Sequence, residues 1–477
     1  MKRYIHLLPL ILLFFISLFH LILFYQYSPT WDFPHNWLIG MIRLGKMPIP
    51  PDIHSVPYGV VSDVLPVALA YLLPFSWQPS SFLILGILTG TLGVIFFYLM
   101  LKETYGTKTA FLSALTIFLL PRFVGHLHTN LKDIGSSAFF LITLYFISRN
   151  FKRFNFKDSL FSIIAFSLAV NTKLTVIQSA PVFLFWIIYK FWRLKKTHNL
   201  TLKIVFKYGF YIFLLFYIPI LCWFLLWPHG QFPFFTTLIY LQSLLSTLPS
   251  TPWYYSIQQI LITTPLPLLF FTPVGLYLLL IKFIKERNEL SGIFFLLFFY
   301  SLLKYPLLHL QITDDIRYFI EIYYPLSLAS VLGVNVLFKK YADFIFIAVF
   351  IFLVILIYRY HPYEINYYNF LSSKENRDED FWASSYQEVF NYINKEVPPD
   401  STVSARLAPE LAAYLIRSDL KRNLNSRSPE ESNFTVILNR PSFFHLFQVE
   451  DFFLNHRPYK LFTDKNGNIL AYFYKLN

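Results

Sequence analysis

The chain alternates long apolar blocks with short charged segments, and within each block the apolar residues are continuous instead of alternating as in a barrel strand. About 20 such residues, at 1.5 Å per residue, cross the ~30 Å hydrocarbon core of a bilayer as an α-helix. The pattern therefore predicts a polytopic α-helical membrane protein of about 11 spans. These spans are 7–25, 81–101, 109–120, 134–148, 159–172, 174–192, 208–226, 262–282, 292–308, 319–337 and 344–360.

The pattern changes near residue 371, after which charged residues are frequent and no long apolar block occurs. We therefore expect a transmembrane domain over 1–370 and a small soluble α/β domain over 371–477. The local patterns in this tail predict a mixed set of elements, including a hairpin that turns at Asn466-Gly467. The expected helices are 385–396 and 442–455, and the expected strands are 402–406, 434–438, 459–463 and 469–474.

Composition agrees with a bilayer as the main solvent, since 56% of the residues are hydrophobic and 14% are charged. The single cysteine, Cys222, excludes a disulfide framework and a thiolate metal centre. Residues 1–25 resemble a secretory signal, but no small-x-small cleavage site follows them, so we expect a retained anchor.

Charge predicts the orientation of the chain in the membrane. If the N-terminus is cytoplasmic, 19 of the 27 Lys and Arg residues before residue 371 fall on the cytoplasmic side, as the positive-inside rule requires. The tail then lies outside, and we expect an integral protein of a prokaryotic plasma membrane. The net charge of +13 is explained by loops beside anionic lipid, so it does not indicate nucleic-acid binding.

The first outer loop is long, over 26–80, and places an acid, Asp32, directly after the first span. Trp31 and Trp37 flank it at the depth where a lipid-borne substrate presents its head group, and His35 lies between them as a candidate ligand for sugar or acceptor. The alternative is an exposed loop acid with two interfacial tryptophans.

The second outer block, PRFVGHLHTNLKD over 121–133, is the densest polar segment between apolar blocks. Ionisable groups there are costly unless they line a wet cavity. Arg122 and Lys132 are candidate phosphate ligands, His126 and Asn130 are candidate sugar or acceptor ligands, and Asp133 is a second catalytic candidate. The alternative is that the cations reach the phosphates of bulk lipid. The two histidines of the block diverge on a helix, so a metal would need ligands from elsewhere.

A third outer segment contains Asp314 and Asp315 beside Arg317. The acids suit sugar hydroxyls, and the arginine suits a phosphate. Lys173, at the end of an apolar stretch, is a further candidate for a lipid phosphate or a lysine that reaches the interface.

The segment from His361 to Asn369 joins the last predicted span to the tail. It is polar and aromatic, as carbohydrate-binding surfaces are, and makes His361 and Tyr363 candidate ligands for sugar or acceptor. A belt of residues at the lipid head groups would have the same composition.

The order of these motifs resembles the polyprenyl-phosphate-dependent membrane glycosyltransferases of the GT-C superfamily, which include protein O-mannosyltransferases and the lipid A aminoarabinose transferase. The resemblance rests on the early acid of the first loop, on PRFVGHLHTNLKD, DDIRYFIEIYYPL and HPYEINYYNF, and on DEDFWASSYQEV at the start of the tail. It implies an inverting transfer of a sugar from a polyprenyl phosphate to an acceptor. Asp32 matches the family's catalytic base, whereas Phe33 stands where relatives often carry a second acid.

Two other functions fit many spans and polar outer loops. One is a transporter or flippase of lipid-linked saccharides, although the chain lacks the paired repeats typical of transporters. The other is a non-catalytic membrane assembly protein. The sequence contains no certain cofactor site, and a divalent metal would suit the phosphate chemistry.

Overall fold

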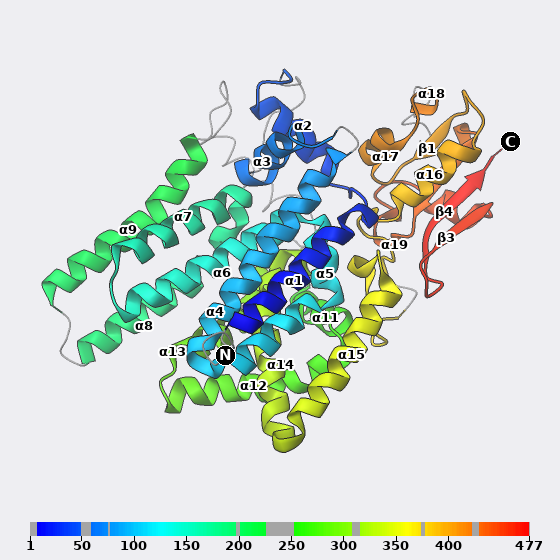
Figure 1. Cartoon of the computed structure of the whole chain (residues 1–477). Helices are drawn as coiled ribbons and strands as arrows, with labels where there is room; N and C mark the ends of the chain where they lie inside the picture. The colour runs from blue at the N-terminus through cyan, green and yellow to red at the C-terminus, as the bar shows by residue number, and fades with distance from the viewer. Residues whose placement is uncertain are drawn as a thin grey trace.

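The structure is a computed structural model, and it describes residues 7–48, 59–74, 77–196, 201–225, 252–307, 315–373, 377–421 and 429–476. A helical bundle carries a small domain with a mixed sheet at one end (Figure 1). The helices of the bundle are α1 (Leu8–Leu23), α2 (Phe33–Arg43), α3 (Val60–Ala70), α4 (Ser80–Phe118), α5 (Pro121–Thr129), α6 (Leu131–Lys152), α7 (Phe156–Thr172), α8 (Ala180–Lys196), α9 (Leu202–Leu225), α11 (Tyr255–Thr263), α12 (Leu266–Lys285), α13 (Glu289–Leu307), α14 (Tyr323–Phe338) and α15 (Ala342–Tyr360).

Eight helices in the described part of the chain are long and apolar enough to cross a membrane. Two of the eight each contain two of the predicted spans, Ser80–Phe118 and Ile316–Tyr360. The first is bent at Gly106, whose φ of 81° falls outside the helical range. A further predicted span, 159–172, lies in α7, which has 17 residues. The total of about 11 spans stays a prediction.

Helix α6 lies at the centre of the bundle, and most of its side chains are buried. Elsewhere in the bundle, α12 and α14 approach closely at two glycines. A Cβ atom on Gly275 would lie 1.7 Å from the Ala329 carbonyl oxygen, and one on Gly333 would lie 2.2 Å from that of Phe271. Small residues of this kind let helix backbones touch in a membrane protein.

The long first loop folds into α2 and α3, which pack against each other beside the small domain (Figure 1). Asp32 immediately precedes α2. The block over 121–133, expected as a loop, is instead the helix α5 followed by the first turn of α6. Asn130 separates the two helices, and its side chain accepts a hydrogen bond from the Asp133 amide.

The small domain has a four-stranded sheet in the order β1-β2-β4-β3, in which β1 is parallel to β2 and the other pairs are antiparallel. The predicted hairpin is confirmed, with Gly467 at a φ of 78°. The prediction of a single helix over 442–455 is wrong, because the structure has two short helices there, α19 and α20. Gln448 lies between them with a φ of 54°, outside the helical range. The elements are α16 (Tyr386–Glu396), β1 (Val403–Ala405), α17 (Pro409–Leu415), α18 (Ser418–Lys421), β2 (Phe434–Leu438), α19 (Pro441–Phe444), α20 (Glu450–Asn455), β3 (Lys460–Thr463) and β4 (Ile469–Lys475).

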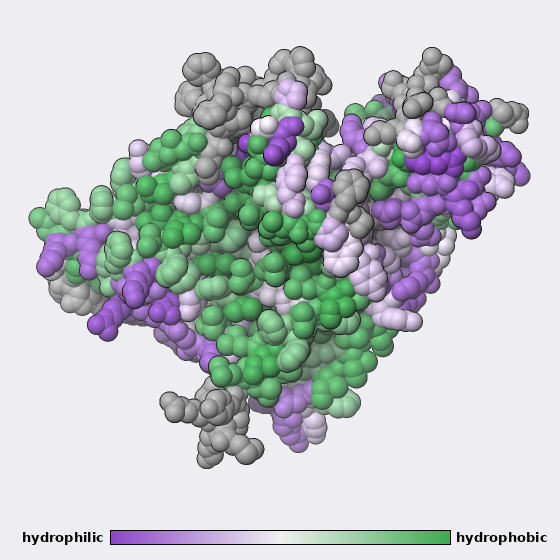
Figure 2. All heavy atoms as spheres, turned by 45° about the horizontal axis from the view of Figure 1, so that its top comes forward, coloured by the Kyte–Doolittle hydropathy of each residue, from purple (hydrophilic) through white to green (hydrophobic). Residues whose placement is uncertain are grey.

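The two ends of the bundle differ in their charged groups. The end near the small domain holds Asp32 and the first turn of α6, whereas the opposite end holds the basic last turns of α6, α8 and α12. Hydrophobic side chains cover much of the bundle between them, and hydrophilic ones cover much of the small domain (Figure 2).

Candidate active site

The Asp32 carboxylate lies between two cations contributed by distant parts of the chain. Arg317 Nη1 is 3.3 Å from Asp32 Oδ2, and Lys132 Nζ is 3.8 Å from the same oxygen. The Asp32 side chain is 33% exposed, whereas those of Arg317 and Lys132 are 12% and 7% exposed. Asp32 is therefore the accessible member of this group.

A second carboxylate, Asp133, lies deeper in the same cluster. It is ion-paired with Lys173, and Asn130 Nδ2 donates a hydrogen bond of 2.7 Å to its Oδ2. Its side chain is 4% exposed. Asn130 also lies 3.2 Å from His126 Nδ1, so three residues of the 121–133 block form one buried network.

Two aromatic rings join the two halves of this cluster. The Arg317 guanidinium lies 5.0 Å from the ring centroids of Tyr318 and Trp382, and Lys173 Nζ lies 4.8 Å from the Tyr318 ring. Trp382 belongs to the tail, and its carbonyl accepts a hydrogen bond of 3.1 Å from the Trp31 amide. The tail thus forms part of the wall around Arg317.

The cluster borders two small hollows in the described part of the chain. The first is lined by Asp32, Lys132, Asn130 and Trp382, and the second by Asp133, Lys173 and Arg317. The charged groups therefore line two neighbouring hollows on either side of Arg317.

A buried ion pair between Lys304 and Glu321 forms the far wall of the second hollow. Their side chains are 4% and 8% exposed, and Ser301 donates a hydrogen bond of 3.2 Å to Glu321. The sequence analysis did not single out this pair. The sequence does contain a feature that could have identified the pair, namely a lysine inside the apolar segment 292–308. Ionisable residues within membrane-spanning segments mark functional sites.

The electrostatics of the cluster keep Asp32 ionised. Burial alone would favour the neutral acid, but the charges of Lys132 and Arg317 outweigh it and lower the pKa of Asp32 below its usual value. Burial also lowers the pKa of His126 to about 3 against the opposing charge of Asp133, so this imidazole is neutral at physiological pH.

The side chain of Arg122, a candidate phosphate ligand, is fully buried and ion-paired with Asp315. Its Nε donates a hydrogen bond of 2.7 Å to the Tyr367 carbonyl, and its guanidinium lies 4.4 Å from the Tyr368 ring centroid. The pair connects α5 to the segment before α14 and to the start of the tail. Asp315 is thereby engaged as well, and Asp314 lies outside the described residues.

Among the other predicted ligands, His35 lies near the Asp32 cluster, since the charges of Lys132 and Asp32 act on its imidazole, whereas His361 and Tyr363 lie apart from the cluster in their contacts. His361 Nδ1 lies 2.9 Å from Glu364, which also accepts a hydrogen bond of 3.0 Å from the Tyr27 hydroxyl. Tyr363 donates a hydrogen bond of 2.6 Å to Glu388 of the tail. His35 is exposed on the first turn of α2. The His361 and Tyr363 contacts tie the tail to the bundle.

The described residues contain no group of three or more His, Cys, Asp or Glu side chains placed to hold a metal ion. The cations of the cluster are instead arranged around Asp32 and Asp133.

Residues 68–223 match the model of the dolichyl-phosphate-mannose-protein mannosyltransferase family. The structure is similar to that of ArnT from Cupriavidus metallidurans bound to undecaprenyl phosphate, with a TM-score of 0.55 and 10% identity over 97% of each chain. The chain has the GT-C glycosyltransferase fold. It also superposes on the apo oligosaccharyltransferase of Archaeoglobus fulgidus, with a TM-score of 0.57 and 11% identity over 94% of this chain and 71% of that chain.

No curated protein sequence matches the chain. The GT-C fold confirms the resemblance predicted from the motifs, including the polytopic helical bundle and the small C-terminal sheet domain.

Proposed function

We propose that the chain transfers a sugar from a polyprenyl-phosphate donor to an acceptor on the outer face of the membrane, with inversion and with Asp32 as the general base. The observation that carries the proposal is an accessible carboxylate held between two buried cations, in a bundle of GT-C fold. ArnT, which shares this fold, binds undecaprenyl phosphate, and this supports a lipid-phosphate donor here.

Accessibility and pairing favour Asp32 over Asp133 as the base. A general base must reach the proton of the acceptor, and the Asp32 carboxylate is a third exposed beside the first hollow. Asp133 is almost fully buried and is neutralised by Lys173, with Asn130 as a second partner. We assign Asp133 the role of holding Lys173 in place.

The reaction then balances with residues of this chain. Asp32 takes the proton of the acceptor group, and the acceptor atom forms the new bond to the anomeric carbon. The bond from that carbon to the phosphate oxygen breaks, and the phosphate leaves with the electron pair. Lys132 and Arg317 stabilise the negative charge that develops on the leaving phosphate.

The same cations link donor binding to the strength of the base. Lys132 and Arg317 contact Asp32. A bound donor phosphate adds a negative charge beside Asp32 and competes for both cations, which raises the pKa of Asp32. The carboxylate thus becomes a stronger base when the donor is in place.

The proposal predicts that a strain without this protein accumulates a polyprenyl-phosphate sugar and lacks that sugar on one surface glycan, lipid or protein. Mass spectrometry of lipid-linked sugars and of surface glycans in the deletion strain and in the complemented strain measures both. A flippase predicts a different result, because the unused donor would then be confined to the cytoplasmic leaflet. Loss of an assembly protein would leave the donor level unchanged.

A second prediction concerns pH. Because the pKa of Asp32 is lowered, the carboxylate stays ionised at pH values below the usual titration range of an aspartate, and the acid limb of kcat/KM lies below that range as well. Arg317→Met removes one of the cations that lower the pKa of Asp32, so this pKa should rise. The acid limb of the kcat/KM profile should then move to higher pH. The control is Lys203→Gln, which removes an exposed cation from α9. If the acid limb of Arg317→Met is unchanged, Asp32 is not the group that acts as the base.

A further inference from the structure

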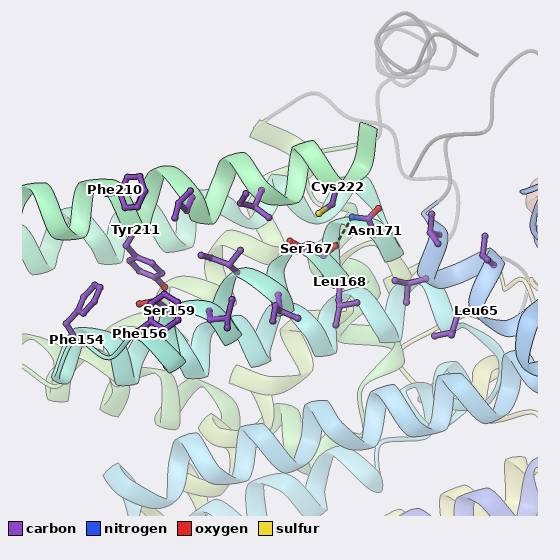
Figure 3. Close-up of a pocket in the computed structure, with 18 of the residues that line it drawn as sticks. Leu65, Phe154, Phe156, Ser159, Ser167, Leu168, Asn171, Phe210, Tyr211 and Cys222 are labelled. Atoms are coloured by element: carbon purple, nitrogen blue, oxygen red, sulfur yellow. Dashed lines mark hydrogen bonds between the residues drawn. The ribbon is translucent and has the colours of Figure 1, made fainter. Parts of the chain in front are cut away.

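An apolar groove of about 900 Å³ runs along α7 and α9 and reaches α3 and Asn171 at the end nearer the Asp32 cluster (Figure 3). Its lining spans Phe156 to Asn171 on α7 and Lys207 to Cys222 on α9. Fifteen residues of helix correspond to about 22 Å, which exceeds the ~15 Å of one leaflet of the hydrocarbon core. A whole acyl chain therefore fits along it.

One end of this groove opens into a polar basin of about 780 Å³. The two spaces share Phe154, Phe156 and Lys207, so they are continuous. The basin is lined by the end of α6, the 153–155 turn and the first turns of α7 and α9. Its charged lining residues are Glu103, Arg149, Lys152, Arg153, Asp158 and Lys207.

The basin has an excess of positive charge. Two of its cations are compensated, since Lys152 lies 2.7 Å from Glu103 and Arg149 lies 3.4 Å from Asp158. Arg153 and Lys207 have no carboxylate partner within the described part of the chain, and both are exposed. Lys207 Nζ lies 3.8 Å from the Phe154 ring centroid, at the boundary of the groove.

We propose that this basin and groove bind an anionic phospholipid, with the phosphate beside Arg153 and Lys207 and one acyl chain along α7 and α9. The charge of the basin selects an anionic head group over a zwitterionic one. The basin that would hold the head group is separate from the donor site, because residues 132 and 149 on α6 are about 25 Å apart along the helix axis. In the proposed orientation the lipid belongs to the cytoplasmic leaflet.

Native mass spectrometry of the purified full chain, titrated with phosphatidylglycerol or phosphatidylcholine, tests the proposal without any transfer assay. The double variant R153Q/K207Q should bind phosphatidylglycerol about tenfold more weakly or worse, since each lost cation near an anionic lipid weakens binding severalfold. The matched control is K157Q/K203Q, which removes two exposed cations from the same helices without touching the basin lining. Equal weakening in both variants, or equal affinity for both lipids, would overturn the proposal.

A second pair of variants tests the groove. Ile164, which lines it, is 44% exposed, whereas Phe213 on α9 is 55% exposed and does not line it. Ile164→Trp should reduce bound phosphatidylglycerol at least fivefold, and Phe213→Trp should leave it unchanged. If undecaprenyl phosphate displaces phosphatidylglycerol one for one, the groove holds the donor chain and the phospholipid assignment is wrong.

Discussion

Asp32→Asn should lower the turnover of sugar transfer by about 10²–10⁴-fold, the usual effect of removing a positioned general base. The asparagine keeps the size of the side chain but cannot accept the acceptor's proton. Donor binding should be retained or become tighter, because Lys132 and Arg317 lose a competing carboxylate. Single-turnover transfer and equilibrium binding of a polyprenyl-phosphate sugar measure the two effects separately.

The matched control is Asp133→Asn, which changes a neighbouring carboxylate that is ion-paired with Lys173. It should weaken donor binding through Lys173, so its effect should appear in KM as well as kcat. Thermal unfolding in detergent must show that both variants are folded. An Asp32→Asn protein that is folded and transfers sugar at the native rate would exclude Asp32 as the base.

Arg122→Met should lower the free energy of unfolding by roughly 3–5 kcal/mol, because it leaves the buried Asp315 carboxylate without its ion pair. The Arg122 side chain is fully buried and that of Asp315 is 7% exposed, so water cannot replace the lost partner. The hydrogen bond to the Tyr367 carbonyl is lost as well. Thermal or denaturant unfolding of the purified protein, followed by tryptophan fluorescence, measures the change.

The double variant Arg122→Met with Asp315→Asn is the control, because it removes both charges. It should recover part of the lost stability, whereas two independent effects would add. If Arg122→Met unfolds at the native temperature and instead loses donor affinity, Arg122 is a phosphate ligand, as expected from the sequence.

Much of the fold follows from local patterns that the sequence displays directly. Continuous apolar blocks predict helices, and the turn at Asn466-Gly467 predicts the hairpin, because each depends on residues close together in the chain. An interruption between residues 101 and 109 was likewise expected, and the structure places a bend there at Gly106. The break at Gln448 was not predicted, because it depends on a single backbone angle.

The candidate site was predicted in part for the same reason. Polar residues between apolar blocks identified Asp32, Lys132, Asp133, Lys173 and Arg317, which the structure brings together. Arg122 also lies in a polar segment between apolar blocks. Its partner, Asp315, is 193 residues away, so only the fold shows that the charge of Arg122 is compensated. The place of Trp382 beside Arg317 likewise depends on how the tail packs on the bundle.

The contact between Trp31 and Trp382 joins residues from opposite ends of the polypeptide, 351 positions apart in the numbering of the chain. During synthesis the wall around Arg317 is therefore incomplete until the tail has been made and has folded against α2. A nascent or prematurely terminated chain would carry Asp32, Lys132 and Arg317 yet lack that wall. The proposed transfer activity would thus require the completed chain. A tail taken from a relative would need a surface that fits the first loop.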